Sequence, residues 1–380
     1  METVLTNARV VTGDEEFDGT VVLKGGLIAS IEQGQSQVSG AKDLDGNYLI
    51  PGLVDLHTDA LEKQMMPRPN VSWNPIAATI AHDALTTTSA ITTVFESLAA
   101  GASVAHPERN ETLKPMIDGL HETQGKGLLR GEHLVHLRCE ITNPMVMDLF
   151  SDVIDHPSIR FMSVNDHAPG HRQYPDMEYY RKKHMKNYGL NDKEMDAFVT
   201  EIQEQSKEFG PKRRAELVEA AHARNIPAAS HDDRTAKEVE LAASEGMVVA
   251  EFPITFEAAD LARKRGLKVL AGGPNLCRGG SHHPGNLLTG DIAKRGSLDI
   301  LVSDYVPISL VQGLFKLASD EFGFSMPDAI AIGSKNPSIA AGLTDRGEIA
   351  VGKRADLAQV KNVDGIPAVR RVWVKGDRVA

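Results

Sequence analysis

A regular alternation of two kinds of segment, between about residues 51 and 340, constrains the fold more than any other feature of this sequence. Short apolar runs rich in β-branched residues alternate with longer segments of helical periodicity, which predicts strand–helix units and a parallel sheet. In a chain of 380 residues, eight such units predict a closed (β/α)8 TIM-like barrel of the α/β class. The strands are expected at 49–56, 87–96, 132–140, 159–166, 226–231, 247–253, 267–271 and 298–304.

The two ends of the chain follow a different pattern. Short strand-like runs punctuated by Gly, Asp and Asn fill residues 1–50, and residues 345–380 repeat the style. The pair Gly25-Gly26 is a hairpin signal, and Gly376-Asp377 predicts a turn near the end. We therefore expect a small β-sandwich built from both termini, beside a barrel that spans 51–344.

One segment, residues 168–225, is too long for a single crossover between strands. It contains Tyr174, Tyr179 and Tyr180, the basic run 181–184 and a charged helical stretch at about 191–209. Two interpretations are open: a solvated helical excursion, or a lid that brings cations to the active site.

The composition excludes several classes of protein. With 41% hydrophobic and 24% charged residues, the chain has the make-up of an ordinary globular protein. Its formal net charge of −11 argues against a nucleic-acid partner, although one cleft can still hold an anion. No apolar stretch approaches the roughly 18 residues that span a bilayer, and the start of the chain resembles no signal peptide. Together with only two cysteines, Cys139 and Cys277, this predicts no membrane partner and a cytoplasmic protein.

Imidazoles and carboxylates gather where the predicted strands end, which is where a (β/α)8 barrel carries its active site. One residue separates the two side chains after the first strand, so both point the same way and can reach one ion. An isolated His or Asp at a strand end usually packs or caps a helix, but the coincidence at five strand ends favours a metal site. The predicted ligands are His57, Asp59, Glu140, His167, His231 and Asp304.

This donor set suits a borderline or hard divalent ion, so we expect zinc, with manganese or iron as alternatives. The number of ligands leaves room for one or two ions, with Glu140 as the bridging ligand between two. Such an ion lowers the pKa of a water molecule toward neutral and so makes it a nucleophile. Asp304 is the predicted catalytic residue, because it would face that water and accept its proton.

Two further motifs carry a family resemblance. Two runs, Pro-Gly-Leu-Val-Asp-Leu-His at 51–57 and the run at 347–357, resemble the motifs that flank the barrel in the amidohydrolase superfamily. The resemblance covers nearly the whole chain and implies a metal-dependent barrel with a sandwich made from both termini. The sequence departs from the commonest pattern of that superfamily, which has a histidine at the position of Asp59 and often a carbamylated lysine at that of Glu140.

Within the superfamily, the motifs look like one branch in particular, which serves the carbon–phosphorus lyase pathway of phosphonate catabolism. The segments that carry this likeness are 56–63, 66–69, 81–83, 91–94, 230–233 and 273–275, with Trp73. The resemblance implies a hydrolase that releases diphosphate from a phosphorylated ribosyl phosphonate. The expected partner is thus a small phosphorylated molecule, and barrels of this type often form homo-oligomers.

A polyphosphate substrate requires cations and N–H donors around the site. The segment 272–286 offers glycines beside Arg and His, although a glycine-rich surface turn would look the same. If a helix begins at Asp232 or Asp233, two further cations lie in its first two turns. The predicted substrate-binding residues are Arg68, Arg234, Lys237, Arg278, His282 and His283, and the wider set of candidates adds Lys63, Arg172, Arg181, Lys183 and His184.

Two alternatives remain at this stage. The same metal site could hydrolyse a C–N bond in a cyclic amide or amidine, but a small neutral ring does not need so many cations. A non-catalytic scaffold is the other alternative, and such a chain should have lost ligands that this sequence retains.

Overall fold

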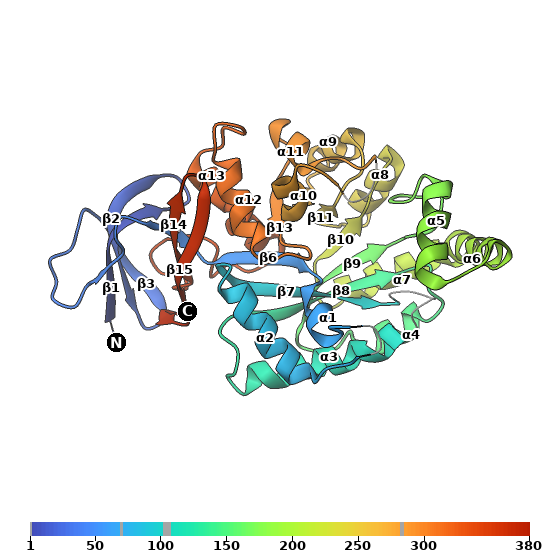
Figure 1. Ribbon diagram of the computed structural model, residues 1–380, viewed down its shortest axis with the longest axis horizontal. Helices are drawn as coiled ribbons and strands as arrows, with labels where there is room; N and C mark the ends of the chain where they lie inside the picture. Colours follow the sequence, from blue (N-terminus) through green and yellow to red (C-terminus); the bar gives the residue numbers. More distant parts are fainter. Residues whose placement is uncertain (1, 69–70, 102–107, 282–284) are drawn as a thin grey trace.

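The computed structural model describes residues 2–68, 71–101, 108–281 and 285–380, and Figure 1 shows their arrangement. Eight parallel strands follow one another in chain order around a barrel. The last strand returns to the first through a bridge between Thr58 and Asp304. The predicted fold class is confirmed. The barrel strands are β6 (Leu53–Thr58), β7 (Ile91–Ala100), β8 (Glu132–Glu140), β9 (Ile159–Asn165), β10 (Ala228–His231), β11 (Val249–Glu251), β12 (Lys268–Gly272) and β13 (Ile300–Val302).

Helices surround the barrel strands, and the apolar side chains of the strands form two layers. Because side chains alternate along a strand, one set packs inside the barrel, where Phe95 and Phe161 meet with ring centroids 6.2 Å apart. The other set packs against helices, for example against Leu120, Leu217 and Leu314. The surrounding helices are α1 (Ala60–Met65), α2 (Pro75–Thr87), α3 (Glu108–Gly125), α4 (Val146–Val153), α7 (Gly210–His222), α8 (Ala236–Ser244), α9 (Phe256–Lys264), α10 (Gly273–Arg278), α11 (Thr289–Lys294), α12 (Ser309–Leu317), α13 (Met326–Ile332) and α14 (Lys335–Ala340).

Strands from both termini form a separate sheet beside the barrel (Figure 1). Its order is β16-β15-β14-β5-β1-β2-β3, with β4 beside β1, so that β5 and β14 join the two chain ends. The sheet folds over its own core, since Trp373 near one edge shares an apolar cluster with Leu23 and Ile28 near the other. The strands are β1 (Glu2–Val11), β2 (Glu16–Lys24), β3 (Leu27–Gln33), β4 (Lys42–Asp43), β5 (Tyr48–Pro51), β14 (Leu357–Val363), β15 (Ile366–Val374) and β16 (Asp377–Arg378).

Two predicted strands need correction. The run 49–56 is two strands, because β5 ends at Pro51 in the terminal sheet and β6 begins at Leu53 in the barrel. The run 87–96 begins too early, since α2 continues to Thr87 and Ala90 turns the chain with a φ of 69°. Apolar or β-branched residues lie on both sides of each boundary, so the pattern of apolar residues alone does not reveal where one element ends and the next begins.

The long segment after β9 is helical, as expected. It forms α5 (Met177–Tyr188), α6 (Asp192–Glu204) and the π-helical turn η1 (Gln205–Phe209), which leads into α7. Figure 1 shows α5 and α6 as a pair at the edge of the barrel. Gly189 ends α5 with a φ of 67°, and Asn191 starts α6 with a capping box. None of the helices in the described part of the chain combines the length and apolarity needed to span a membrane.

Candidate active site

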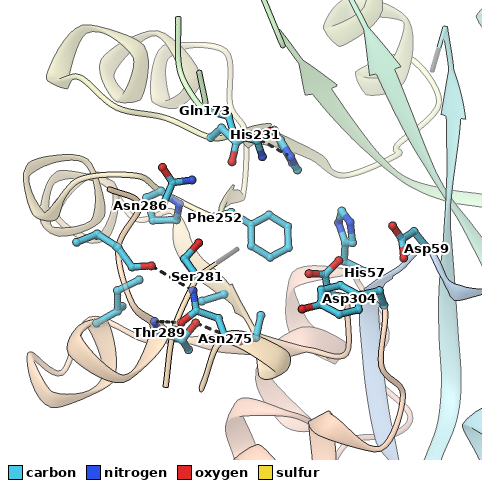
Figure 2. Close-up of a pocket in the computed structure, with 18 of the residues that line it drawn as sticks. His57, Asp59, Gln173, His231, Phe252, Asn275, Ser281, Asn286, Thr289 and Asp304 are labelled. Atoms are coloured by element: carbon cyan, nitrogen blue, oxygen red, sulfur yellow. Dashed lines mark hydrogen bonds and ion pairs between the residues drawn. The ribbon is translucent and has the colours of Figure 1, made fainter. Parts of the chain in front are cut away.

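Two cavities open at the carboxyl ends of the barrel strands. The first has a volume of about 210 Å³ and is lined mainly from β11, β12, β13 and the loops that follow them (Figure 2). The second, of about 520 Å³, lies between the ends of β8 and β9 and the helices α5 and α6. Asp59, Arg138 and Gln173 line both cavities, so the two are neighbours that share one wall.

A buried glutamate orients two of the predicted metal ligands. Glu251, at the end of β11, places one carboxylate oxygen 3.1 Å from Nδ1 of His57 and the other 3.1 Å from Nδ1 of His231. Although burial alone would raise its pKa, the neighbouring histidines hold the pKa of Glu251 well below its usual range. Both imidazoles therefore donate from Nδ1 and are left with Nε2 as the free acceptor, which is how metal-binding histidines are usually held.

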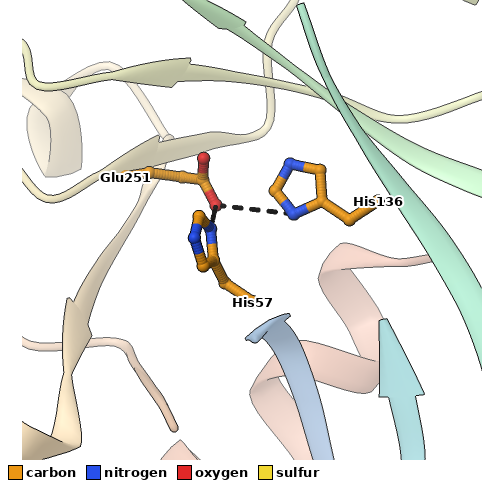
Figure 3. Close-up of side chains that lie close together, drawn as sticks. All are labelled: His57, His136 and Glu251. Atoms are coloured by element: carbon orange, nitrogen blue, oxygen red, sulfur yellow. Dashed lines mark hydrogen bonds and ion pairs between the residues drawn. The ribbon is translucent and has the colours of Figure 1, made fainter. Parts of the chain in front are cut away.

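A third histidine, His136 on β8, lies near this pair but is held differently (Figure 3). Its Nδ1 lies 2.9 Å from the carbonyl oxygen of Leu56 and 3.9 Å from Glu251. Burial lowers the pKa of His136 to about 3, so its ring is neutral. Although one atom each from His57, His136 and Glu251 lie close together, those atoms take part in hydrogen bonds. We interpret the cluster as a support beneath the site rather than as an ion-binding site.

Two more of the predicted ligands, Glu140 and His167, lie at the ends of β8 and β9, close to Asp232 at the end of β10. His167 places Nδ1 2.5 Å from Glu140, whose other oxygen accepts a hydrogen bond from the Thr142 hydroxyl at 2.6 Å. Asp232 Oδ2 lies 3.6 Å from Nε2 of His167 and 3.5 Å from Nε2 of His231. Burial opposes a charge on His167, but Glu140 and Asp232 raise its pKa to about 9.

Several polar atoms of this group are buried and lack a hydrogen-bond partner. Oδ1 of Asp59 and Oδ2 of Asp232 are of this kind among the described residues. Asp59 occupies the N-cap position of α1 without forming a capping hydrogen bond, so capping does not explain its presence. Ligand atoms of His167, His231 and Asp232 all lie within 4.8 Å of one another. Buried carboxylate oxygens and imidazole nitrogens gathered in this way are the donors that a divalent cation takes in proteins.

Asp304 follows β13 and faces the first cavity (Figure 2). Its backbone N–H donates to the carbonyl oxygen of His57 at 3.0 Å, so closure of the barrel sets its position. Burial, with the charge of Asp59 nearby, raises the pKa of Asp304 to about 6. Asp232, Phe252 and Asp304 all have a left-handed φ between 51° and 56°. Such strained turns at three strand ends direct side chains into the mouth of the barrel.

Three further residues of the site were missed in the sequence. Glu251 ends the sixth strand, so the same inspection of strand ends would have revealed it. Asp232 follows His231 directly, and only its left-handed backbone brings it to the cavities. Arg138 precedes Glu140 by two residues and so shares its face of β8. In the described part of the chain, the side chain of Arg138 forms no ion pair, and its Nε is buried without a hydrogen-bond partner.

Four of the predicted substrate-binding residues lie outside the two cavities. None of Arg68, Arg234, Lys237 and Arg278 lines either cavity, and His282 and His283 fall outside the described residues. Arg278 nevertheless donates to the hydroxyl of Tyr305, which lines the first cavity. For these residues the substrate-binding role stays a prediction.

The structure also shows where the helices near these cations begin and end. The helix after β10 begins at Ala236 with Thr235 as its N-cap, because Asp232 is left-handed and Asp233 binds Arg172. Arg172 also donates to the carbonyl oxygen of His231 at 2.6 Å, and so it supports the site from behind. Within 272–286, residues 273–278 form α10 rather than an open loop.

The comparisons with known proteins agree with this architecture. A model of the amidohydrolase family matches residues 215–379. The chain belongs to the amidohydrolase family, as its sequence motifs predicted. It is 39% identical over 377 residues to alpha-D-ribose 1-methylphosphonate 5-triphosphate diphosphatase of Escherichia coli (strain K12), covering 99% of this chain and 100% of that protein.

Two solved structures show the same fold at low sequence identity. N-acetylglucosamine-6-phosphate deacetylase from Pasteurella multocida has a TM-score of 0.63 and 14% identity. A Xaa-Pro dipeptidase with bound methionine has a TM-score of 0.67 and 15% identity. Each likeness covers 100% of both chains, so the barrel and the terminal sheet occur together in these proteins.

Proposed function

We propose that this chain is a metal-dependent hydrolase that cleaves the phosphoanhydride of α-D-ribose 1-methylphosphonate 5-triphosphate. The products are α-D-ribose 1-methylphosphonate 5-phosphate and diphosphate. The observation that carries the proposal is the 39% identity to the Escherichia coli diphosphatase over the full length of both proteins. The two cavities with cationic side chains, next to a carboxylate-rich site, support it.

The proposed ligands of the metal are His57, Asp59, Glu140, His167, His231 and Asp304. A bound divalent ion would supply Lewis acidity toward a phosphoryl oxygen and would make the attacking water more acidic. Residues of the chain would transfer the proton and stabilise the negative charge. Asp304 accepts the proton as the water oxygen bonds to phosphorus and the P–O bond to the diphosphate breaks. Arg138, which faces both cavities, offsets the negative charge on the phosphoryl oxygens.

Finer assignments belong to the same proposal. Zinc is the preferred metal, at one or two ions per chain, because its coordination suits mixed imidazole and carboxylate donors. Manganese and iron are the alternatives. The pathway is phosphonate catabolism, the compartment is the cytoplasm and the assembly is a homo-oligomer. Two free cysteines, Cys139 and Cys277, support the choice of compartment.

Phosphorus NMR of the zinc-loaded protein with the ribosyl triphosphate tests the reaction directly. We expect diphosphate to appear, and Asp304→Asn to slow its release about 100-fold or more, as loss of a proton acceptor does. The matched control is Asp291→Asn, since Asp291 is exposed on α11. Ring opening of a cyclic amide without any phosphorus change would instead favour the C–N hydrolase alternative.

A further inference from the structure

The two cavities differ in the chemistry of their walls. Beyond the shared residues and the imidazoles and carboxylates of the candidate metal site, the first presents neutral polar groups, such as Asn275, Asn286 and Thr289, beside the ring of Phe252 (Figure 2). The second presents the Lys183 ammonium and the imidazole of His184, both from α5, among tyrosines. One cavity therefore suits a hydroxylated, weakly charged group, and the other suits a strongly charged anion.

Lys183 supplies the positive charge of the second cavity, whereas His184 is neutral, because burial and the neighbouring Lys183 lower its pKa to about 4. Lys183 donates to the hydroxyl of Tyr174 at 3.1 Å and forms no ion pair within the described part of the protein. Both ring nitrogens of His184 are buried without a hydrogen-bond partner among the described residues. The carboxylate of Glu140 also lines this cavity, but His167 and Thr142 already bind its oxygens.

The substrate of the proposed function has two unlike ends, and the inference rests on that function. The leaving diphosphate is compact and multiply charged, so it requires charge-assisted hydrogen bonds. The ribosyl methylphosphonate carries a single charge, two hydroxyl groups and an apolar methyl group. Neutral amides, a threonine hydroxyl and an aromatic ring match this end better than an ammonium group does.

We propose that the second cavity is the subsite for the leaving diphosphate, which Lys183 and His184 hold from α5. The first cavity then takes the ribosyl methylphosphonate end. The bond that breaks lies at the shared wall, beside Asp59 and Arg138. The helical pair α5–α6 thus contributes a binding surface and is more than a solvated excursion from the barrel.

Direct binding of inorganic diphosphate, measured by calorimetry on zinc-loaded protein, tests this assignment. We expect Lys183→Met to weaken binding by roughly tenfold or more, the size expected for a lost hydrogen bond to a charged group, and Lys183→Arg to restore most of it. Lys182→Met is the matched control, because Lys182 is exposed on the same helix and lines neither cavity. Metal content is measured in every sample, so that a loss of zinc is not mistaken for a loss of the subsite.

A reciprocal variant separates the two cavities. Asn286→Ala should weaken binding of the ribosyl methylphosphonate 5-phosphate product while leaving diphosphate binding unchanged. If Lys183→Met weakens the ribosyl product instead, or leaves diphosphate binding at the wild-type value, the assignment is overturned. If the binding results contradict the assignment but the wild-type protein still cleaves the triphosphate, only the assignment of the subsite is rejected. If the wild-type protein leaves the triphosphate intact, the proposed function itself fails.

Discussion

At the scale of single residues, the site depends on side chains that line neither cavity. Glu251 fixes which nitrogen of His57 and of His231 carries the proton, and its own charge is kept by the histidines around it. Arg172 likewise supports the site, because it donates a hydrogen bond to the backbone carbonyl oxygen of His231. Such partners of ligands typically affect metal affinity almost as strongly as the ligands themselves.

Replacement of Glu251 should therefore weaken metal binding. Glu251→Gln removes the charge that keeps both imidazoles oriented, and we expect the affinity for zinc to fall about 10- to 100-fold. Competition with a chelator of known affinity measures the change. Glu257→Gln is the control, since Glu257 is exposed on α9. An unchanged affinity would mean that Glu251 only fills space in the barrel.

The acidic and imidazole residues of the site are easier to predict from the sequence than its cations. Buried strands end at or next to His57, Glu140 and His231, so the apolar residues before them predict that these side chains lie at the mouth of the barrel. Arg68 and Lys237 lie in exposed surface positions, where no periodic pattern constrains the direction of a side chain. Lys183 was one of many candidate cations, because only the packing of α5 turns it toward the cavity.

At the scale of elements, the junction between β5 and β6 connects the two parts of the fold. Gly52 stands between the strands, and a Cβ atom there would lie 2.2 Å from the hydroxyl oxygen of Thr92. The close approach explains why a single residue can separate a strand of the terminal sheet from a strand of the barrel. The division into 1–50, 51–344 and 345–380 stays a prediction, which the end of β5 at Pro51 and the start of β14 at Leu357 support.

A methyl group at this junction should be costly. Gly52→Ala forces Thr92 or the backbone to move, and we expect the free energy of unfolding to fall by about 1–3 kcal/mol, as overpacking does. Addition of Thr92→Ala should recover part of the loss. Gly125→Ala provides the control, since a Cβ there meets no atom within 4 Å. Denaturant titration followed by circular dichroism compares the variants, and equal midpoints for Gly52→Ala and the wild type would contradict the steric explanation.

At the scale of the whole molecule, a buried charged cluster joins α2 to the barrel far from the cavities. His133 lies 2.7 Å from Glu96 and 3.3 Å from Asp83, and His82 lies 3.1 Å from Glu96. Burial opposes the charge on His133, but Asp83 and Glu96 raise its pKa to about 9. The pKa of Glu96 is lowered to about 2 by the two histidines, although burial works against this.

These shifts predict how stability depends on pH. Because the folded-state pKa of His133 is raised, its contribution is fully present below its unfolded pKa of about 6.5 and is lost as pH rises through about 9. The midpoint temperature of thermal unfolding should therefore decrease as the pH is raised from about 6.5 to about 9. Glu96→Gln removes one partner of the histidine, so the fall should become shallower, whereas Glu122→Gln at an exposed position should leave it unchanged. Parallel slopes in all three proteins would exclude His133 as the source.

The pairing of β5 with β14 also determines the order in which the protein can be completed during synthesis. Leu49 pairs with Gln359, so the first strands leave the ribosome long before their partner has been made. Until then the edge of β5 is open, and the terminal sheet lacks β14, β15 and β16. The terminal sheet can therefore be completed only after the barrel strands, which lie between β5 and β14 in the chain, have been translated.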